Sequence, residues 1–62
     1  MFQKGDVVVL KSGGPKMTIT GLPNEHSRGF FCEWFDENGA LSRARFAGEA
    51  LKRVDGDHVA AI

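Results

Sequence analysis

The residues best placed to do chemistry in this sequence are two adjacent glycines between two lysines. Gly13 and Gly14 stand between Lys11 and Lys16, a combination that could hold a phosphate group. A nucleotide-binding loop also needs a helix after the glycines, because the first amides of that helix face the anion. Here a strand-like run follows, and Pro15 removes one backbone amide. The segment therefore predicts a tight turn flanked by lysines rather than a phosphate site.

The other reactive side chains do not form a catalytic or metal-binding set. Cys32 is the single cysteine, and its place in an apolar run is typical of a small buried side chain rather than a nucleophile. His26 and His58 give no zinc-ligand spacing with one cysteine. Asp36 and Glu37 precede Asn-Gly, where acidic residues commonly bond their own backbone. We expect no enzymatic activity, no metal, no cofactor and no small-molecule substrate.

Two phenylalanines give the sequence a candidate binding surface. Phe31 and Phe35 fall on the same side of a strand-like run, and if Glu33 faces water, both rings point outward with it. Val7 and Val9 share the outer side of the first strand. Exposed aromatic and apolar side chains on one sheet face are typical of a docking surface for a protein partner or a second copy of the chain.

Five basic residues give an alternative candidate surface, for RNA or DNA. The candidate nucleic-acid contacts are Lys11, Lys16, Arg43, Arg45 and Arg53. Arginines beside outward aromatics are found in proteins that bind single-stranded nucleic acid. The formal net charge of the chain is zero, however, whereas non-specific binding to nucleic acid depends on a large basic footprint. Protein binding is therefore the leading interpretation.

Glycine and proline divide the chain into short segments with the alternating pattern of β-strands. We predict strands over residues 5–11, 17–20, 29–35, 40–46 and 51–54. Asn38-Gly39 predicts a hairpin between the third and fourth strands. The segment 47–50 has room for one helical turn only. Together they predict an all-β fold, a small SH3-like five-stranded antiparallel barrel with one short helical turn before the last strand.

The apolar positions of these strands predict a small core and a single domain. The expected core consists of Val8, Leu10, Met17, Ile19, Cys32, Trp34, Phe46 and Leu51. Residues 1–54 form the predicted domain, and residues 55–62 a flexible C-terminal tail. The chain has 62 residues, no signal-peptide pattern and no apolar run long enough to span a bilayer. With one cysteine, a cytoplasmic location and no membrane contact are the expectation.

Two strings of residues resemble a known family. LKSGGPKMT over residues 10–18 and CEWFD over residues 32–36, with Gly-Asp-Val-Val at residues 5–8 and Phe46 and Leu51, resemble the YodC-like family of small uncharacterised bacterial proteins. The resemblance covers the chain up to about residue 54 and implies a short cytosolic protein, bacterial or phage-associated, without an established activity. Val9 departs from the family pattern, in which a polar residue is usual at that position. The opening strand also resembles, over a short stretch, the first strand of KOW-type barrels.

Overall fold

The fold is a single antiparallel sheet of five strands, described here for residues 2–54 from a computed structural model. The strands are β1 (Val7–Leu10), β2 (Met17–Gly21), β3 (Phe30–Phe35), β4 (Leu41–Phe46) and β5 (Leu51–Arg53). One 3₁₀ turn, η1 (Gly48–Ala50), precedes β5. The order across the sheet is β4-β3-β2-β1-β5. The predicted all-β class, the five strands and the short helical turn before the last strand are confirmed.

The sheet has two ends, and closure into a barrel is not confirmed. β4 and β5 are the outer strands, and within residues 2–54 no strand pairing joins them. The single-domain boundary at residue 54 stays a prediction, and the predicted tail lies outside the described residues. No helix in the described part of the chain is long and apolar enough to cross a membrane.

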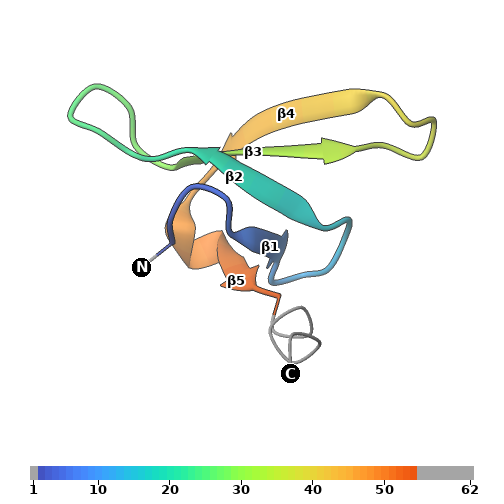
Figure 1. The fold of residues 1–62 in the computed structure, drawn as a ribbon. Coiled ribbons are helices and arrows are strands. Elements are labelled where there is room, and N and C mark those ends of the chain that lie inside the picture. Colours follow the sequence, from blue (N-terminus) through green and yellow to red (C-terminus); the bar gives the residue numbers. More distant parts are fainter. Residues whose placement is uncertain (1, 55–62) are drawn as a thin grey trace.

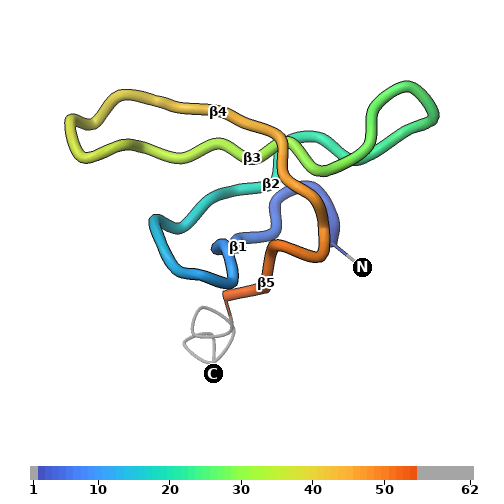
Figure 2. Tube along the Cα trace, turned by 180° about the vertical axis from the view of Figure 1, so that it is seen from behind, coloured from blue at the N-terminus to red at the C-terminus, as the bar shows by residue number. Residues whose placement is uncertain are grey.

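β2 links the two halves of the sheet and changes direction near its end. Its first residues pair with β1 through Val7↔Thr18, and it pairs with β3 through Ile19↔Cys32. The register then shifts between Ile19 and Gly21, which is the signature of a β-bulge. A bulge bends its strand and increases the local twist. In Figures 1 and 2 the β3–β4 hairpin accordingly lies on one side of β2, with β1 and β5 on the other.

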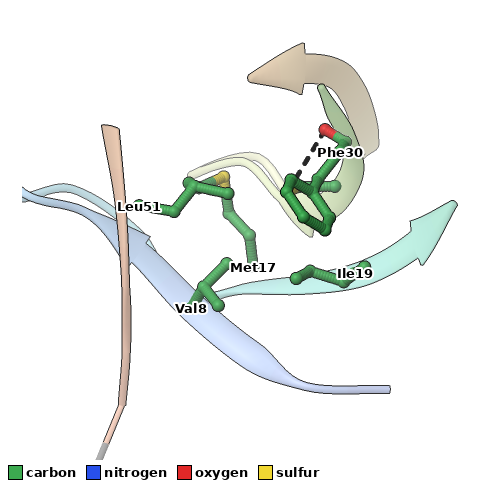
Figure 3. Packing of buried hydrophobic residues seen from close by; sticks show 6 residues of the cluster. Val8, Met17, Ile19, Phe30 and Leu51 are labelled. Carbon is green, nitrogen blue, oxygen red and sulfur yellow. Dashed lines mark hydrogen bonds between the residues drawn. The ribbon is translucent and has the colours of Figure 1, made fainter. Parts of the chain in front are cut away.

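The core lies between these two halves and is small. The buried side chains are Val8, Met17, Ile19, Phe30, Cys32 and Leu51 (Figure 3). Phe2, Leu10, Trp34 and Phe46 pack against them and stay partly exposed. Five of the eight predicted core residues are therefore buried, whereas Leu10, Trp34 and Phe46 form the rim. The predicted core lacks Phe30, which is only 4% exposed and faces the same side as Cys32.

The N-terminal segment closes one end of this core. The ring of Phe2 meets that of Phe30 edge to face, with 5.4 Å between the ring centres. The guanidinium of Arg53 lies 5.8 Å from the centre of the Phe2 ring and 3.0 Å from Asp6 Oδ2. The pKa of Asp6 is lowered, chiefly because the backbone N–H of Gln3 donates to its carboxylate, with Arg53 adding to the effect and desolvation opposing it. Asp6 thus links the first residues of the chain to the last strand.

The lowered pKa of Asp6 makes a signed prediction about acid stability. The pKa of Asp6 lies below its ordinary value of 3.8 in the folded state, so the ionised carboxylate stabilises the fold above pH 3.8. This stabilisation is lost as the pH falls through the lower pKa of the folded state. We expect Asp6→Asn to lower the urea midpoint at neutral pH, and this loss to shrink as the pH is lowered further and further below 3.8. A loss of the same size across this acid range would contradict this role of the charge.

Two glycines with positive φ differ in the space around them. Gly39 closes the β3–β4 turn at φ +82°, its N–H donates to Asp36 O at 2.9 Å, and nothing lies within 4 Å of where a Cβ would stand. Gly29 precedes β3 at φ +92°, and there a Cβ would stand 2.8 Å from the carbonyl oxygen of Phe46. That oxygen belongs to paired backbone at the end of β4, which cannot move without disturbing the ladder. Gly29 is therefore required for both its conformation and its size.

Alanine at each glycine separates these two requirements. Gly39→Ala tests conformation alone and is expected to cost about 1–2 kcal/mol. Gly29→Ala adds the clash with the Phe46 carbonyl, for which we expect about 1–3 kcal/mol more. Urea unfolding of both variants measures the difference. Equal destabilisation by the two variants would mean that the Phe46 carbonyl moves away from the added methyl group without a loss of stability.

Candidate interaction surface

The register between β3 and β4 determines which side chains can act outside the core. The pairs Phe31↔Arg45, Glu33↔Arg43 and Phe35↔Leu41 alternate with the inward pairs. Thr18 pairs with Glu33 from β2 and so lies on the same side of the sheet. We define the outer face as the side chains of β2, β3 and β4 that point away from the core: Thr18, Thr20, Phe31, Glu33, Phe35, Leu41, Arg43 and Arg45.

One end of the outer face, beside the β3–β4 turn, is apolar and open to solvent. Phe35 is 69% exposed and Leu41 is 61% exposed, and the two lie directly opposite each other on neighbouring strands. They border a shallow depression of about 440 Å³. Lys16, Thr18, Thr20, Glu33 and Trp34 complete its lining. A cross-strand apolar pair left open at the edge of such a depression is a feature of docking surfaces.

The centre of the outer face is a small polar network built around Glu33. Its Oε2 accepts a hydrogen bond from the hydroxyl of Thr20 at 3.1 Å and lies 3.9 Å from Nη1 of Arg43. The Glu33 side chain is a quarter exposed, whereas that of Arg43 is 67% exposed. An ion pair this exposed contributes well under about 1 kcal/mol. The network therefore orders Glu33 and leaves Arg43 able to change partner.

The far end of the outer face combines an aromatic ring with a cation. The guanidinium of Arg45 lies 5.6 Å from the centre of the Phe31 ring and donates to the hydroxyl of Ser27. Phe31 is 38% exposed, so Arg45 covers part of its surface. Thr20, Gly21, Phe31, Glu33 and Arg43 line a second depression of about 300 Å³ between this end and the centre. Cation and ring here hold each other in place.

The four predicted members of the interaction surface differ in their exposure. Phe31 and Phe35 point outward from β3 and are exposed. Val7 and Val9 are half-buried on β1, and neither lines the depressions beside the two rings. Leu41 is the residue that the predicted surface lacks. Its position across the hairpin from Phe35 is the sequence signal that could have identified it.

The five predicted nucleic-acid contacts do not gather on one surface. Arg43 and Arg45 share the outer face, and Lys16 lines the depression beside Phe35. Lys11 follows β1, and its amide donates to Ala50 O at 2.9 Å. Arg53 lies at the other edge of the sheet, against Asp6 and Phe2. Two arginines, rather than a basic stripe of five residues, therefore accompany the exposed ring of Phe31.

Cys32 is a core residue. Its side chain is fully buried, with Sγ 3.8 Å from the carbonyl oxygen of Phe30. Burial raises the pKa of the Cys32 thiol, which keeps it protonated at neutral pH. Within residues 2–54, no three His, Cys, Asp or Glu side chains come together as metal ligands. The predicted turn chemistry is seen at Asp36, whose Oδ1 accepts from the amides of Asn38 and Ala40.

Comparison with known proteins gives a family but no activity. A model of the family described as "Uncharacterized small protein (DUF2158)" matches residues 3–51. The chain belongs to this family. The match agrees with the resemblance to a small uncharacterised family, while the narrower YodC-like assignment stays a prediction. No curated protein and no solved structure matches the chain.

Removing single rings tests the division between core and outer face. Phe30→Ala empties a buried position and is expected to cost about 3–5 kcal/mol. Phe35→Ala removes an exposed ring and is expected to cost less than about 1 kcal/mol. Chemical unfolding of both variants at the same pH gives the two values. A large loss for Phe35→Ala would mean that this ring belongs to the core.

Proposed function

We propose that this protein is a non-enzymatic binding module that docks a protein partner on the outer face. The observation that carries the proposal is the exposed pair of Phe35 and Leu41, which face each other across the β3–β4 hairpin. Apolar side chains held rigidly by a paired hairpin lose little freedom when a partner covers them. The polar network around Glu33 lies beside them and supplies the polar rim that protein interfaces commonly have.

Protein is better supported than nucleic acid as the partner. Arg43 and Arg45 flank an exposed ring and Lys16 lines the depression beside Phe35, but Arg53 lies at the other edge of the sheet. Glu33 stands between the arginines and the Phe35 end. With a formal net charge of zero, the chain lacks the excess of cations that binding to a phosphate backbone uses. RNA or DNA binding through Arg43 and Arg45 is the alternative function.

The proposal includes a finer description of the fold and its setting. The strand order β4-β3-β2-β1-β5, the bulge in β2 and the 3₁₀ turn before β5 support an SH3-like plan. Such a plan hosts many binding functions, so the surface rather than the fold supports the function. The motif strings at residues 10–18 and 32–36 support the YodC-like assignment. A single cysteine supports action in the cytoplasm.

Affinity capture with matched variants tests the proposed surface. Tagged wild type, the double variant Phe35→Ser with Leu41→Ser, and the control Leu22→Ser are used on the same lysate. Leu22 is 41% exposed but lies outside the outer face, so its variant loses exposed apolar area elsewhere. We expect the control to recover as much partner as the wild type does. The double variant is expected to recover at least about tenfold less partner, measured by quantitative mass spectrometry.

Two outcomes would contradict the proposal, and sedimentation tests one form of the partner. Equal recovery by the double variant and the wild type would remove Phe35 and Leu41 from the interface. A dimeric wild type with a monomeric Phe31→Glu variant would identify a second copy as the partner, whereas two monomers exclude that form. Tight binding to a single-stranded oligonucleotide that falls steeply with salt would favour the nucleic-acid alternative.

A further inference from the structure

β4 offers an unpaired strand edge along the outer face. It is the last strand on its side of the sheet, and within residues 2–54 nothing pairs with its far edge. Asp36 and Ala40 continue the β3–β4 register, and the amide of Asp36 donates to Ala40 O. They therefore form one of the hydrogen-bonded pairs of the antiparallel ladder. Since such pairs alternate along an antiparallel ladder, the backbone groups of Ser42 and Ala44 face β3. Those of Leu41, Arg43 and Arg45 therefore point outward.

The side chains along this edge determine which charge an added strand should carry. Leu41, Arg43 and Arg45 all lie on the outer face, so an added strand would meet one apolar and two cationic side chains at alternate positions. Ser42 and Ala44 point to the other side and leave room for small apolar side chains. Asp36 and Glu37 lie in the turn that precedes Leu41, with Asp36 hydrogen-bonded to Ala40. Acidic side chains of an added strand are thus favoured opposite Arg43 and Arg45 and disfavoured near the turn.

A second copy of this chain does not fit the edge well. Two β4 strands can pair antiparallel only with outward residues opposite outward residues. Of the registers this allows, the two with the fullest overlap place Arg43 opposite Arg43, or Arg43 opposite Arg45. Like charges directly opposite each other destabilise a sheet. The arginines therefore oppose self-pairing and favour an acidic strand.

We propose that β4 is the site where an extended segment of the protein partner adds to the sheet, antiparallel to β4. The segment carries acidic residues opposite Arg45 and Arg43 and an apolar residue opposite Leu41, which gives the pattern acidic–x–acidic–x–apolar. This inference rests on the proposed function and specifies its partner. The outward backbone groups bind the segment, and the side chains of β4 determine its sequence. The antiparallel direction is taken because antiparallel pairing is the more stable of the two per residue.

A synthetic peptide tests this inference directly. The probe is the blocked peptide Thr-Glu-Val-Glu-Val-Leu-Thr, and its control carries lysine for both glutamates. In NMR titrations of the full chain, we expect the glutamate peptide to shift the amides of Leu41, Arg43 and Arg45 and to slow their hydrogen exchange. The lysine peptide is expected to bind at least about tenfold more weakly. If these three amides are already protected in the free protein, the edge is covered and the inference is wrong.

Methyl groups on the peptide backbone distinguish strand addition from side-chain contact. Methylation of the central glutamate nitrogen removes a donor that faces β4 and is expected to weaken binding at least about tenfold. Methylation of the following valine nitrogen, which faces away from β4, is expected to change binding less than about threefold. Equal effects at both positions, or no shift of the β4 amides at about 1 mM peptide, overturn the inference.

Variants of the protein distinguish failure of this inference from failure of the proposed function. Arg43→Pro removes an outward N–H at an edge, where proline is tolerated, and Arg43→Ala is its matched control for the lost charge. We expect the peptide to lose binding to Arg43→Pro well beyond the loss with Arg43→Ala. If capture of the partner depends on Phe35 and Leu41 while Arg43→Pro matches Arg43→Ala, the outer face stands as the docking surface and strand addition is wrong. If none of these substitutions changes the amount of partner recovered, the proposed function fails as well.

Discussion

The alternation of side chains along β3 is the constraint on which the rest of this structure depends. Six residues of β3 pair in unbroken register with six of β4, and every second side chain faces the core. Phe30 and Cys32 are buried as a result, while Phe31 and Phe35 are exposed. A slip of one residue would exchange these two sets and place Glu33 in the core. One register thus determines both what stabilises the domain and what it can present to a partner.

That register is held at both ends by local features with clear physical causes. At the turn, Asp36 bonds the amides of Asn38 and Ala40, and Gly39 takes the positive φ that a glycine allows. At the other end, Gly29 leaves space for the carbonyl oxygen of Phe46. Because the turn end is closed by local hydrogen bonds and the other end is joined to the core through Phe30 and Phe46, the hairpin is a firm base for its exposed pair, Phe35 and Leu41.

Local patterns predicted much of the fold because strands and turns depend on neighbouring residues. The alternation of Met17 to Thr20 and the Asn38-Gly39 turn were enough to place strands within one or two residues of their bounds. The contact of Phe2 with Phe30 was not predictable in this way, and neither was the ion pair of Arg53 with Asp6, which joins residues 47 positions apart. Leu41, by contrast, could have been assigned to the outer face from the sequence, because the predicted Asn38-Gly39 turn places it across the hairpin from Phe35.

The two arginines of β4, Arg43 and Arg45, explain how an exposed edge can persist. A six-residue edge strand with open backbone groups invites pairing with any extended chain. Two cations at alternate positions, Arg43 and Arg45, restrict that pairing to strands of opposite charge and discourage a second copy. Arg43 shares only a weak, exposed ion pair with Glu33, so an acidic strand can compete for it at little cost. Protection against self-pairing and selection of an acidic partner are therefore two effects of one charge pattern.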